Sequence, residues 1–247
     1  MITPLQKTLP YDPVAQRALP GIQPLPPEEW LITDEAYEGQ MALRDTLLAD
    51  HRDKVLALDE SAREAALELL DLVLEQAYPG AADSVTRPDG VTVPIDRDDP
   101  LGTIGRLIQE DVNILQKQGN EHVLTGGVMC FPASWTLSEK FMRPMVRIHK
   151  PVTVYDENIA KRVQRLFDGI RAGKPLWRFN VLGYHDPALH QPRTEDAPRD
   201  KKSPEPAGYL RSERQVMMRL PRTGAVAFII HTYVIARKDA PPGVLDT

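Results

Sequence analysis

The clearest pattern in the chain predicts a β-hairpin near its C-terminal end. Residues 209–220 alternate with a period of two, which places the polar side chains of Arg-x-Glu-x-Gln at 211–215 on one face of a strand. Residues 225–230 are almost continuously apolar, and Pro-Arg-Thr-Gly at 221–224 supplies a tight turn between the two stretches. The polar face indicates either the floor of a pocket with polar anchors or a half-solvated antiparallel hairpin.

Elsewhere, apolar residues at helical spacing and cap-like residues predict helices, and short apolar runs predict strands. Ser61 with Glu64, and Thr136 with Glu139, have the spacing of capping boxes at two helix starts. Paired glycines at 126–127 favour a bulge within a strand over a close approach of backbone to a ligand. The expected helices are 35–50, 61–78, 100–119, 137–144 and 157–172, and the expected strands are 122–131, 176–182 and an edge strand at 91–93.

Proline-rich segments divide the rest of the chain. Residues 1–29 contain seven prolines and predict an extended arm with no element of its own. Residues 185–208 are rich in proline and charge and predict a surface insertion, and 237–247 predict an unpacked tail. We expect one domain, 30–236, of the α+β class, with helices on one side of a mainly antiparallel sheet.

Composition excludes several classes of function. The net charge of −5 and the lack of a basic stripe argue against nucleic acid as a partner. No apolar run approaches the length of a membrane span, and no secretion signal is present at the start, so a cytoplasmic protein is expected. A single cysteine, Cys130, excludes an internal disulfide and every metal motif that needs several cysteines.

The familiar catalytic motifs for dinucleotides, phosphate loops, zinc proteases and nucleophile elbows are absent. Among six histidines, His51, His185 and His190 are expected to be solvated, and His122 to be structural. His149 differs because Pro151 restricts the backbone just after it. A histidine held in this way suits the single axial bond that haem needs, although a buried core histidine is the simpler interpretation.

Five segments together give the chain a resemblance to a known family. FPASWTLSEKF at 131–141, IHKPV at 148–152, WRFN at 177–180, LRSERQ at 210–215 and RLPRTGAVAFIIHTY at 219–233 occur in the family's order. They resemble the successive motifs of the haem-dependent oxidative N-demethylase alpha-subunit-like family. The resemblance extends from about Trp30 to Tyr233.

The resemblance implies a PAS-like antiparallel sheet with flanking helices that holds haem b. It implies His149 as the proximal iron ligand, and Tyr155 and Glu213 as residues of the distal pocket. Arg211, Arg214 and His231 would be partners of the haem propionates or of the pocket carboxylate. The implied reaction is oxidative N-demethylation of a small secondary amine such as dimethylamine with O₂, giving formaldehyde.

The chain carries no flavin or iron-sulfur motif, so the implied electrons must come from a separate electron-transfer protein or reductase subunit, and an oligomer is allowed. The family more often has tryptophan where this chain has Val181, which suggests a reshaped pocket. A PAS-like haem or small-molecule sensor without turnover, and a paralogue that has lost haem, are the alternatives.

Overall fold

The computed structural model describes residues 3–15, 21–148, 157–197 and 205–245, with only the backbone described at 157–161. Its helices are α1 (Tyr37–Asp50), α2 (Arg52–Val55), α3 (Arg63–Ala77), α4 (Pro100–Leu107), α5 (Leu137–Lys140), α6 (Met145–Ile148) and α7 (Glu157–Gly169), with 3-10 turns η1 (Pro27–Glu29), η2 (Glu60–Ala62) and η3 (Arg237–Asp239). Its strands are β1 (Gln23–Pro24), β2 (Leu56–Leu58), β3 (Ser84–Thr86), β4 (Thr92–Pro94), β5 (Asp111–Gln118), β6 (Glu121–Val128), β7 (Leu176–Tyr184), β8 (Tyr209–Arg219) and β9 (Val226–Ala236).

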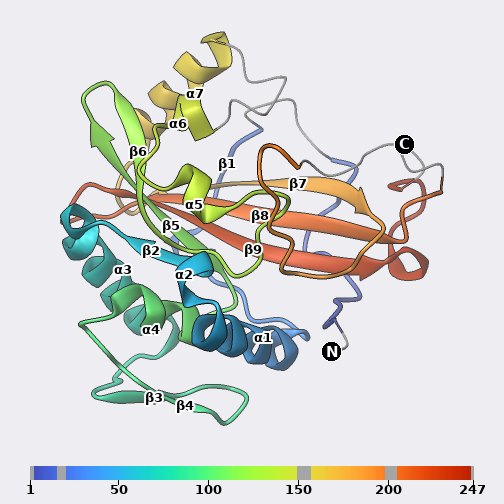
Figure 1. Cartoon of the computed structure of the whole chain (residues 1–247), viewed down its shortest axis with the longest axis horizontal. Coiled ribbons are helices and arrows are strands. Elements are labelled where there is room, and N and C mark those ends of the chain that lie inside the picture. Colours follow the sequence, from blue (N-terminus) through green and yellow to red (C-terminus); the bar gives the residue numbers. More distant parts are fainter. Residues whose placement is uncertain (1–2, 16–20, 149–156, 198–204, 246–247) are drawn as a thin grey trace.

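One antiparallel sheet of seven strands forms the centre of the molecule, in the order β1-β7-β8-β9-β5-β6-β2 (Figure 1). The predicted hairpin is confirmed: β8 and β9 pair along their whole length, from Tyr209 opposite Ala236 to Arg219 opposite Val226. Gly224 lies in the turn with φ of 71°, a conformation that glycine adopts without steric cost. The expected α+β class holds for the described chain, as a single domain of mixed helix and sheet.

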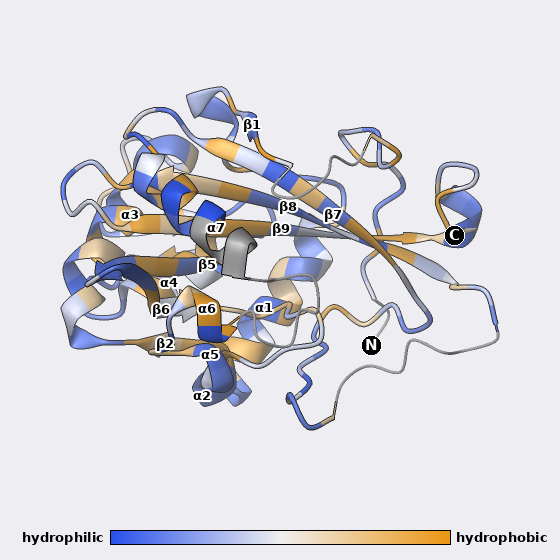
Figure 2. Cartoon of the chain, turned by 90° about the horizontal axis from the view of Figure 1, so that it is seen from above, coloured by the Kyte–Doolittle hydropathy of each residue, from blue (hydrophilic) through white to orange (hydrophobic). Residues whose placement is uncertain are grey.

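Helices cover both faces of the sheet, so the expectation of helices on one side is wrong (Figure 1 and Figure 2). Helices α1 to α4 cover one face, which we call the inner face, and enclose the largest apolar core there. Helices α5 to α7 cover the opposite face, which we call the outer face. Two smaller apolar clusters lie there, one against α6 and α7 and one against α5.

The apolar spacing of residues 108–119 predicted that they form the second half of a helix, and this prediction is wrong. Helix α4 ends at Leu107, and β5 follows at once. In this strand Val112 and Ile114 belong to the inner core while Leu115 packs on the outer face, so the true period is two. β-Branched residues between two polar runs favour a strand, and pairing with β6 and β9 decides the outcome.

The glycine pair of β6 lies at a bulge, as expected. The register of β5 and β6 shifts so that Ile114 faces Gly126 while Leu115 faces Leu124. A Cβ atom on Gly127 would lie 2.7 Å from the Asn113 Oδ1 atom and 3.2 Å from the Val112 carbonyl oxygen, so a larger residue would require these neighbours to move. Packing within the sheet therefore explains the glycine.

The N-terminal arm does contribute an element, contrary to expectation. Strand β1 pairs with β7 through Gln23 and Trp177. The Tyr11 ring stacks on Phe179 with 4.4 Å between ring centroids, and the Tyr11 and Ser212 hydroxyls lie 2.9 Å apart. The arm therefore forms part of the inner face.

Two other local predictions change. Asp59, not Ser61, caps the turn before α3, because its carboxylate accepts a hydrogen bond from the Ser61 amide at 3.0 Å. The expected edge strand at 91–93 is part of β4, which pairs with β3 in a separate two-stranded sheet.

The insertion at 185–208 is partly packed in its described portion, since Leu189 is 1% exposed. An ion pair ties it to α6: the Arg147 guanidinium donates to both Glu195 carboxylate oxygens at 2.7 and 3.0 Å. No helix in the described ranges has the length and apolar character needed to span a membrane.

Candidate functional site

The polar face of β8 is the outer face of the sheet, and it is covered. Residues 210–217 are buried on both faces, so the half-solvated hairpin is wrong. Asn180 of β7 lies directly opposite Glu213, and Arg178 lies opposite Gln215. Alternation along each strand therefore gathers these four polar side chains on one side of the central strands.

Glu213 is held firmly through one oxygen of its carboxylate. The Asn180 Nδ2 and Gln215 Nε2 groups both donate to Glu213 Oε2 at 2.9 Å, and the Glu213 amide donates to Asn180 Oδ1 at 3.0 Å. The residue is 8% exposed. In the described part of the chain, Oε1 accepts no hydrogen bond, so this oxygen can accept one from a ligand.

Arg178 brings a positive charge to the same face without a carboxylate partner. Among the described residues its guanidinium makes no hydrogen bond or ion pair, and its Nε is buried and unsatisfied. Burial lowers the pKa of Arg178, and the charge of Glu213 only partly opposes this. A desolvated cation without an anion is an energetic cost that a bound anion would relieve.

Beside this polar group lies a cluster of apolar side chains on β6, β9 and α5, which we call the apolar surface. Its buried members are Leu124, Met129, Leu137 and Ile230, with Trp135, Ile148 and Phe228 packed against them. Two polar atoms on this face, Asn113 Oδ1 and Thr232 Oγ1, are buried and find no partner in the described chain. A ligand that reached this face could satisfy these two atoms.

The segment that carries the predicted iron ligand follows directly after a residue of this apolar surface. Ile148, the last residue of α6, packs there, and Lys140 Nζ donates to its carbonyl oxygen at 2.6 Å. His149 and Tyr155 themselves lie outside the described residues. Helix α7 returns to the same face, where Phe167 packs with Met217.

Arg211 lies on the outer face, but its guanidinium is engaged by backbone. It donates to the carbonyl oxygens of Ala188 and Leu189 at 3.1 Å and of Phe131 at 2.8 Å. The residue is 2% exposed and lies over the Tyr184 ring. In this arrangement it fixes the insertion to the chain that follows β6.

Arg214 and His231 lie on the inner face, opposite each other on β8 and β9 and away from Glu213. The Arg214 guanidinium donates to the Glu29 carbonyl oxygen and lies over the Trp177 ring. Val181 pairs with Ser212, which contacts Tyr11 of the arm, so Val181 also belongs to the inner face. The sequence predictions for these residues thus split between two sides of the sheet.

His231 is fully enclosed between two carboxylates. Its Nδ1 lies 3.0 Å from Glu110 Oε1, and its Nε2 lies 3.0 Å from Asp34 Oδ2. Burial alone would lower the pKa of His231, but the two carboxylates raise it to about 9. Burial would raise the pKa of Asp34, yet His231 outweighs it and lowers that pKa to about 2. An imidazolium that is hydrogen-bonded to two carboxylates in this position has a structural role.

The remaining candidates are structural or lie apart. His122 bonds Gln164, as expected for a structural histidine, whereas His190 is not freely solvated because its ring contacts the Cys130 carbonyl oxygen at 2.8 Å. Burial raises the pKa of Cys130 to about 12, so this thiol is neutral. No group of three or more His, Cys, Asp or Glu in the described ranges could hold a metal ion.

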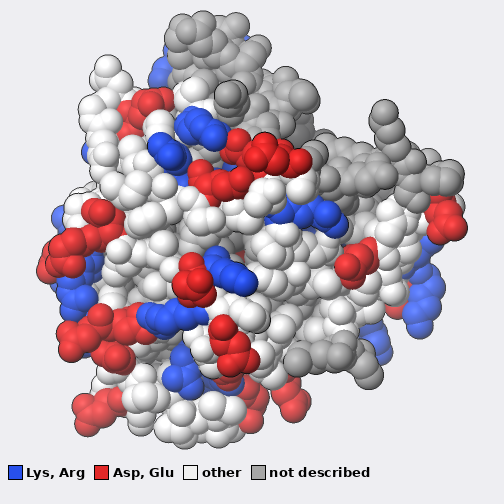
Figure 3. Space-filling view, viewed as in Figure 1, with Lys and Arg blue, Asp and Glu red and all other residues white. Residues whose placement is uncertain are grey.

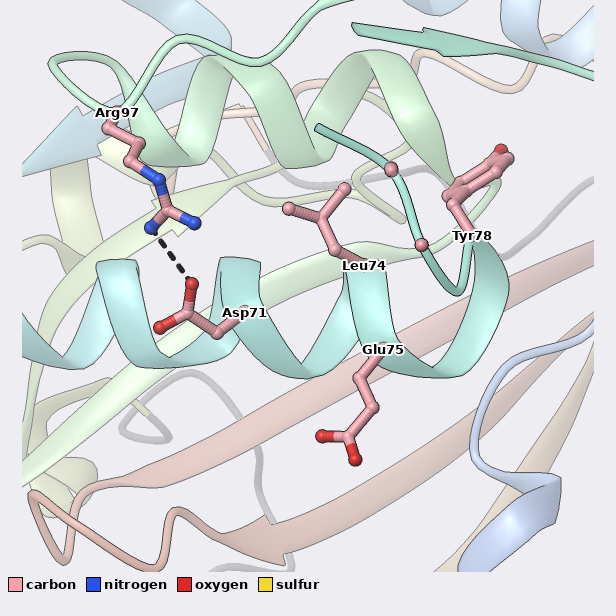
Figure 4. Close-up of a pocket in the computed structure, with 7 residues that line it drawn as sticks. Asp71, Leu74, Glu75, Tyr78 and Arg97 are labelled. Carbon is pink, nitrogen blue, oxygen red and sulfur yellow. Dashed lines mark hydrogen bonds and ion pairs between the residues drawn. The ribbon is translucent and has the colours of Figure 1, made fainter. Parts of the chain in front are cut away.

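A surface depression of about 190 Å³ lies elsewhere, beside α3 (Figure 4). The Arg97 guanidinium donates to Asp71 at 2.8 Å across it. Its position on the inner-face helices separates it from Glu213. The depression is lined by Asp71, Leu74, Glu75, Tyr78, Gly80, Ala81 and Arg97.

Sequence reasoning missed Arg178 and Asn180 as site residues, although the signal was present. Residues 176–182 were expected to form a strand, and alternation puts 178 and 180 on one face of it. The missing information was the partner strand. Pairing of β7 with β8 brings that face beside Glu213.

Fold and site together define a single-domain protein of mixed helix and sheet. On one face its antiparallel sheet carries a buried carboxylate and a guanidinium that forms no ion pair with the described residues. The sequence matches the family described as haem-dependent oxidative N-demethylase, alpha subunit-like, over residues 21–240, and the chain belongs to this family. The resemblance inferred from the motifs is confirmed. The family's description implies dependence on haem and a subunit of a larger enzyme.

Proposed function

We propose that the chain is the haem-binding oxygenase subunit of an enzyme that removes a methyl group from a small secondary amine. The observation that carries the proposal is Glu213, a buried carboxylate whose Oε1 is left without a donor while Oε2 is fixed by Asn180 and Gln215. The family match supplies the cofactor. We also propose that the domain is PAS-like, because a large antiparallel sheet is flanked by helices.

The outer face fits haem b in its chemistry. The apolar cluster around Ile230 offers contact for a porphyrin, and Arg178 offers a charge for a propionate. We propose His149 as the iron ligand, because the residue before it already packs on that surface. Tyr155 is proposed to line the pocket near the substrate.

Bound haem would supply the activation of O₂ that oxidises the methyl group. The net reaction is R–NH–CH₃ + O₂ + 2 e⁻ + 2 H⁺ → R–NH₂ + HCHO + H₂O. Because no flavin or iron-sulfur motif is present in the chain, a separate electron-transfer protein or reductase subunit would deliver both electrons.

The protein's own contribution is to hold and orient the amine. A small secondary amine is a cation at neutral pH, and its N–H would donate to Glu213 Oε1. Because Oε2 is already fixed by two amides, the carboxylate cannot turn away, and the methyl carbon is presented in one orientation.

Replacing Glu213 with glutamine tests this role. Glu213→Gln keeps the shape and can still accept from Asn180, but it removes the charge, so haem content should be unchanged. Amine affinity should fall roughly ten- to hundredfold, as expected when a charge-assisted hydrogen bond is lost. The measurement is the change in haem absorption on titration with dimethylammonium, with formaldehyde release as the assay of turnover.

The matched control is Glu64→Gln, which alters an exposed carboxylate on α3. If Glu213→Gln responds to the amine as the wild type does, Glu213 is not the amine anchor. Haem binding with no formaldehyde from any amine would instead identify a sensor, and protein without haem would identify a paralogue that has lost it.

A further inference from the structure

Arg178 requires an explanation that the proposed amine contact does not give. Its Nε is buried without a partner, and within the described chain the guanidinium meets no carboxylate. Burial lowers its pKa, so the folded protein bears the cost of desolvating this charge. Arg44, Arg211 and Arg214 also have one buried nitrogen without a partner, but each donates through another nitrogen, as Arg44 does to Asp111 at 2.7 Å. Within the described chain, Arg178 donates through none.

Its position in the sheet places it next to the amine anchor. Arg178 is opposite Gln215 and therefore diagonal to Glu213, a relation that brings long side chains within reach of one another. Gln215 lies between the two charges, and its Nε2 is committed to Glu213 Oε2. Glu213 uses only Oε2 on Asn180 and Gln215, and no hydrogen bond or ion pair within the described chain joins it to Arg178, so Arg178 is available for a ligand.

We propose that Arg178 is a carboxylate-binding residue of this site. The guanidinium geometry matches the two oxygens of a carboxylate, and binding would neutralise a charge that forms no ion pair within the described chain. Two sources can supply the group: a substrate that carries a carboxylate, or a propionate of the haem. The first source rests on the proposed function and defines the substrate class as N-methyl amino acids.

The substrate source follows from the pairing of charges on this face. An N-methyl amino acid carries its ammonium and its carboxylate on the same carbon, so one small ligand can meet Glu213 and Arg178 together. Dimethylammonium meets only Glu213. The wild-type protein would then bind N-methylglycine at least tenfold more tightly than dimethylammonium.

Calorimetric titration of the purified protein with N-methylglycine, and separately with dimethylammonium, tests the first source. Arg178→Gln should remove the preference for N-methylglycine and leave the affinity for dimethylammonium unchanged. Titration with haem and with haem dimethyl ester, whose propionates are blocked, tests the second source. Wild-type protein should prefer haem at least tenfold, and Arg178→Gln should remove that preference.

Controls separate a ligand role from a structural one. Arg178→Lys keeps the charge and should retain part of the preference, and Arg171→Gln changes an exposed arginine of the α7–β7 connection and should retain all of it. The melting temperature of Arg178→Gln should equal or exceed that of the wild type, because the arginine has no partner to lose.

The proposal is overturned if Arg178→Gln changes neither preference, or if its melting temperature falls while both preferences persist. These titrations do not depend on turnover. A protein that makes no formaldehyde but still loses carboxylate binding with Arg178→Gln would refute the proposed reaction and retain the carboxylate site.

Discussion

At the scale of single residues, the two faces of β8 and β9 use their charges differently. On the outer face, Glu213 and Arg178 each keep an atom that has no partner among the described residues. On the inner face, His231 uses both ring nitrogens on Asp34 and Glu110, and Asp34 also accepts from Gln109 at 2.8 Å. The first arrangement suits a ligand, whereas the second joins distant parts of the chain.

The His231 cluster makes stability depend on pH at the alkaline side. In the folded protein the pKa of His231 is about 9, above the ordinary 6.5. The contribution of His231 to the free energy of unfolding is therefore complete below pH 6.5 and is lost as pH rises through 9. The loss is on the order of 3 kcal/mol. Urea unfolding at a series of pH values should show this slope in the wild type and not in His231→Gln.

The same cluster also makes the free energy of unfolding depend on pH in the acid range. The pKa of Asp34 is lowered from 3.8 to about 2, so its contribution is complete above 3.8 and is lost as pH falls towards 2. An equal alkaline slope in His231→Gln and the wild type would show that the imidazole is neutral in the folded protein. The sequence could not predict this cluster, because residues 34, 110 and 231 meet only through the fold.

At the scale of elements, the β8–β9 hairpin depends on α3 for its turn. The Glu68 carboxylate, whose side chain is 2% exposed, accepts from the Thr223 amide at 2.9 Å and from the Thr223 hydroxyl at 2.7 Å. It also accepts from the Arg222 amide. Two turn amides therefore find their acceptor on a helix of the inner face.

Glu68→Ala should lower the free energy of unfolding by about 3 kcal/mol, because it leaves these donors without their charged acceptor. Urea denaturation measures the change. Glu75→Ala, an exposed site on the same helix, should change it by less than about 0.5 kcal/mol. Equal losses in the two variants would contradict a specific role for Glu68.

The turn itself was predictable from Pro221 and Gly224, and so was the length of the hairpin. Strand β5 was not, because its apolar residues satisfy a helical spacing as well as a strand's alternation. Only its pairing with β9 settles the choice. Similarly, the strand β1 is two residues long, and no periodicity could reveal it.

At the scale of the whole molecule, the two faces of the sheet carry different groups. The inner face carries the large core, the N-terminal arm and the His231 cluster. The outer face carries Glu213, Arg178 and the apolar surface beside α5. On the described part of the surface seen in Figure 3, acidic and basic side chains are interspersed.

Motifs along the sequence indicated the family and the hairpin, but they placed all candidate residues in one site. Whether a strand residue faces the inner or the outer side follows from strand order and from which helices cover each face. Arg214 and Glu213 are neighbours in sequence and lie on opposite faces. That distinction needs the assembled sheet.

The central claim is that the outer face holds haem through His149, and the absorption spectrum of purified protein tests it most directly. Wild-type protein produced with iron and a haem precursor should show a Soret band, as should His51→Ala, which alters an exposed histidine. His149→Ala should lose stable haem or show the spectrum of a site without its proximal nitrogen, and added imidazole should restore part of the signal. Wild-type haem content and an unchanged spectrum in His149→Ala would contradict the claim.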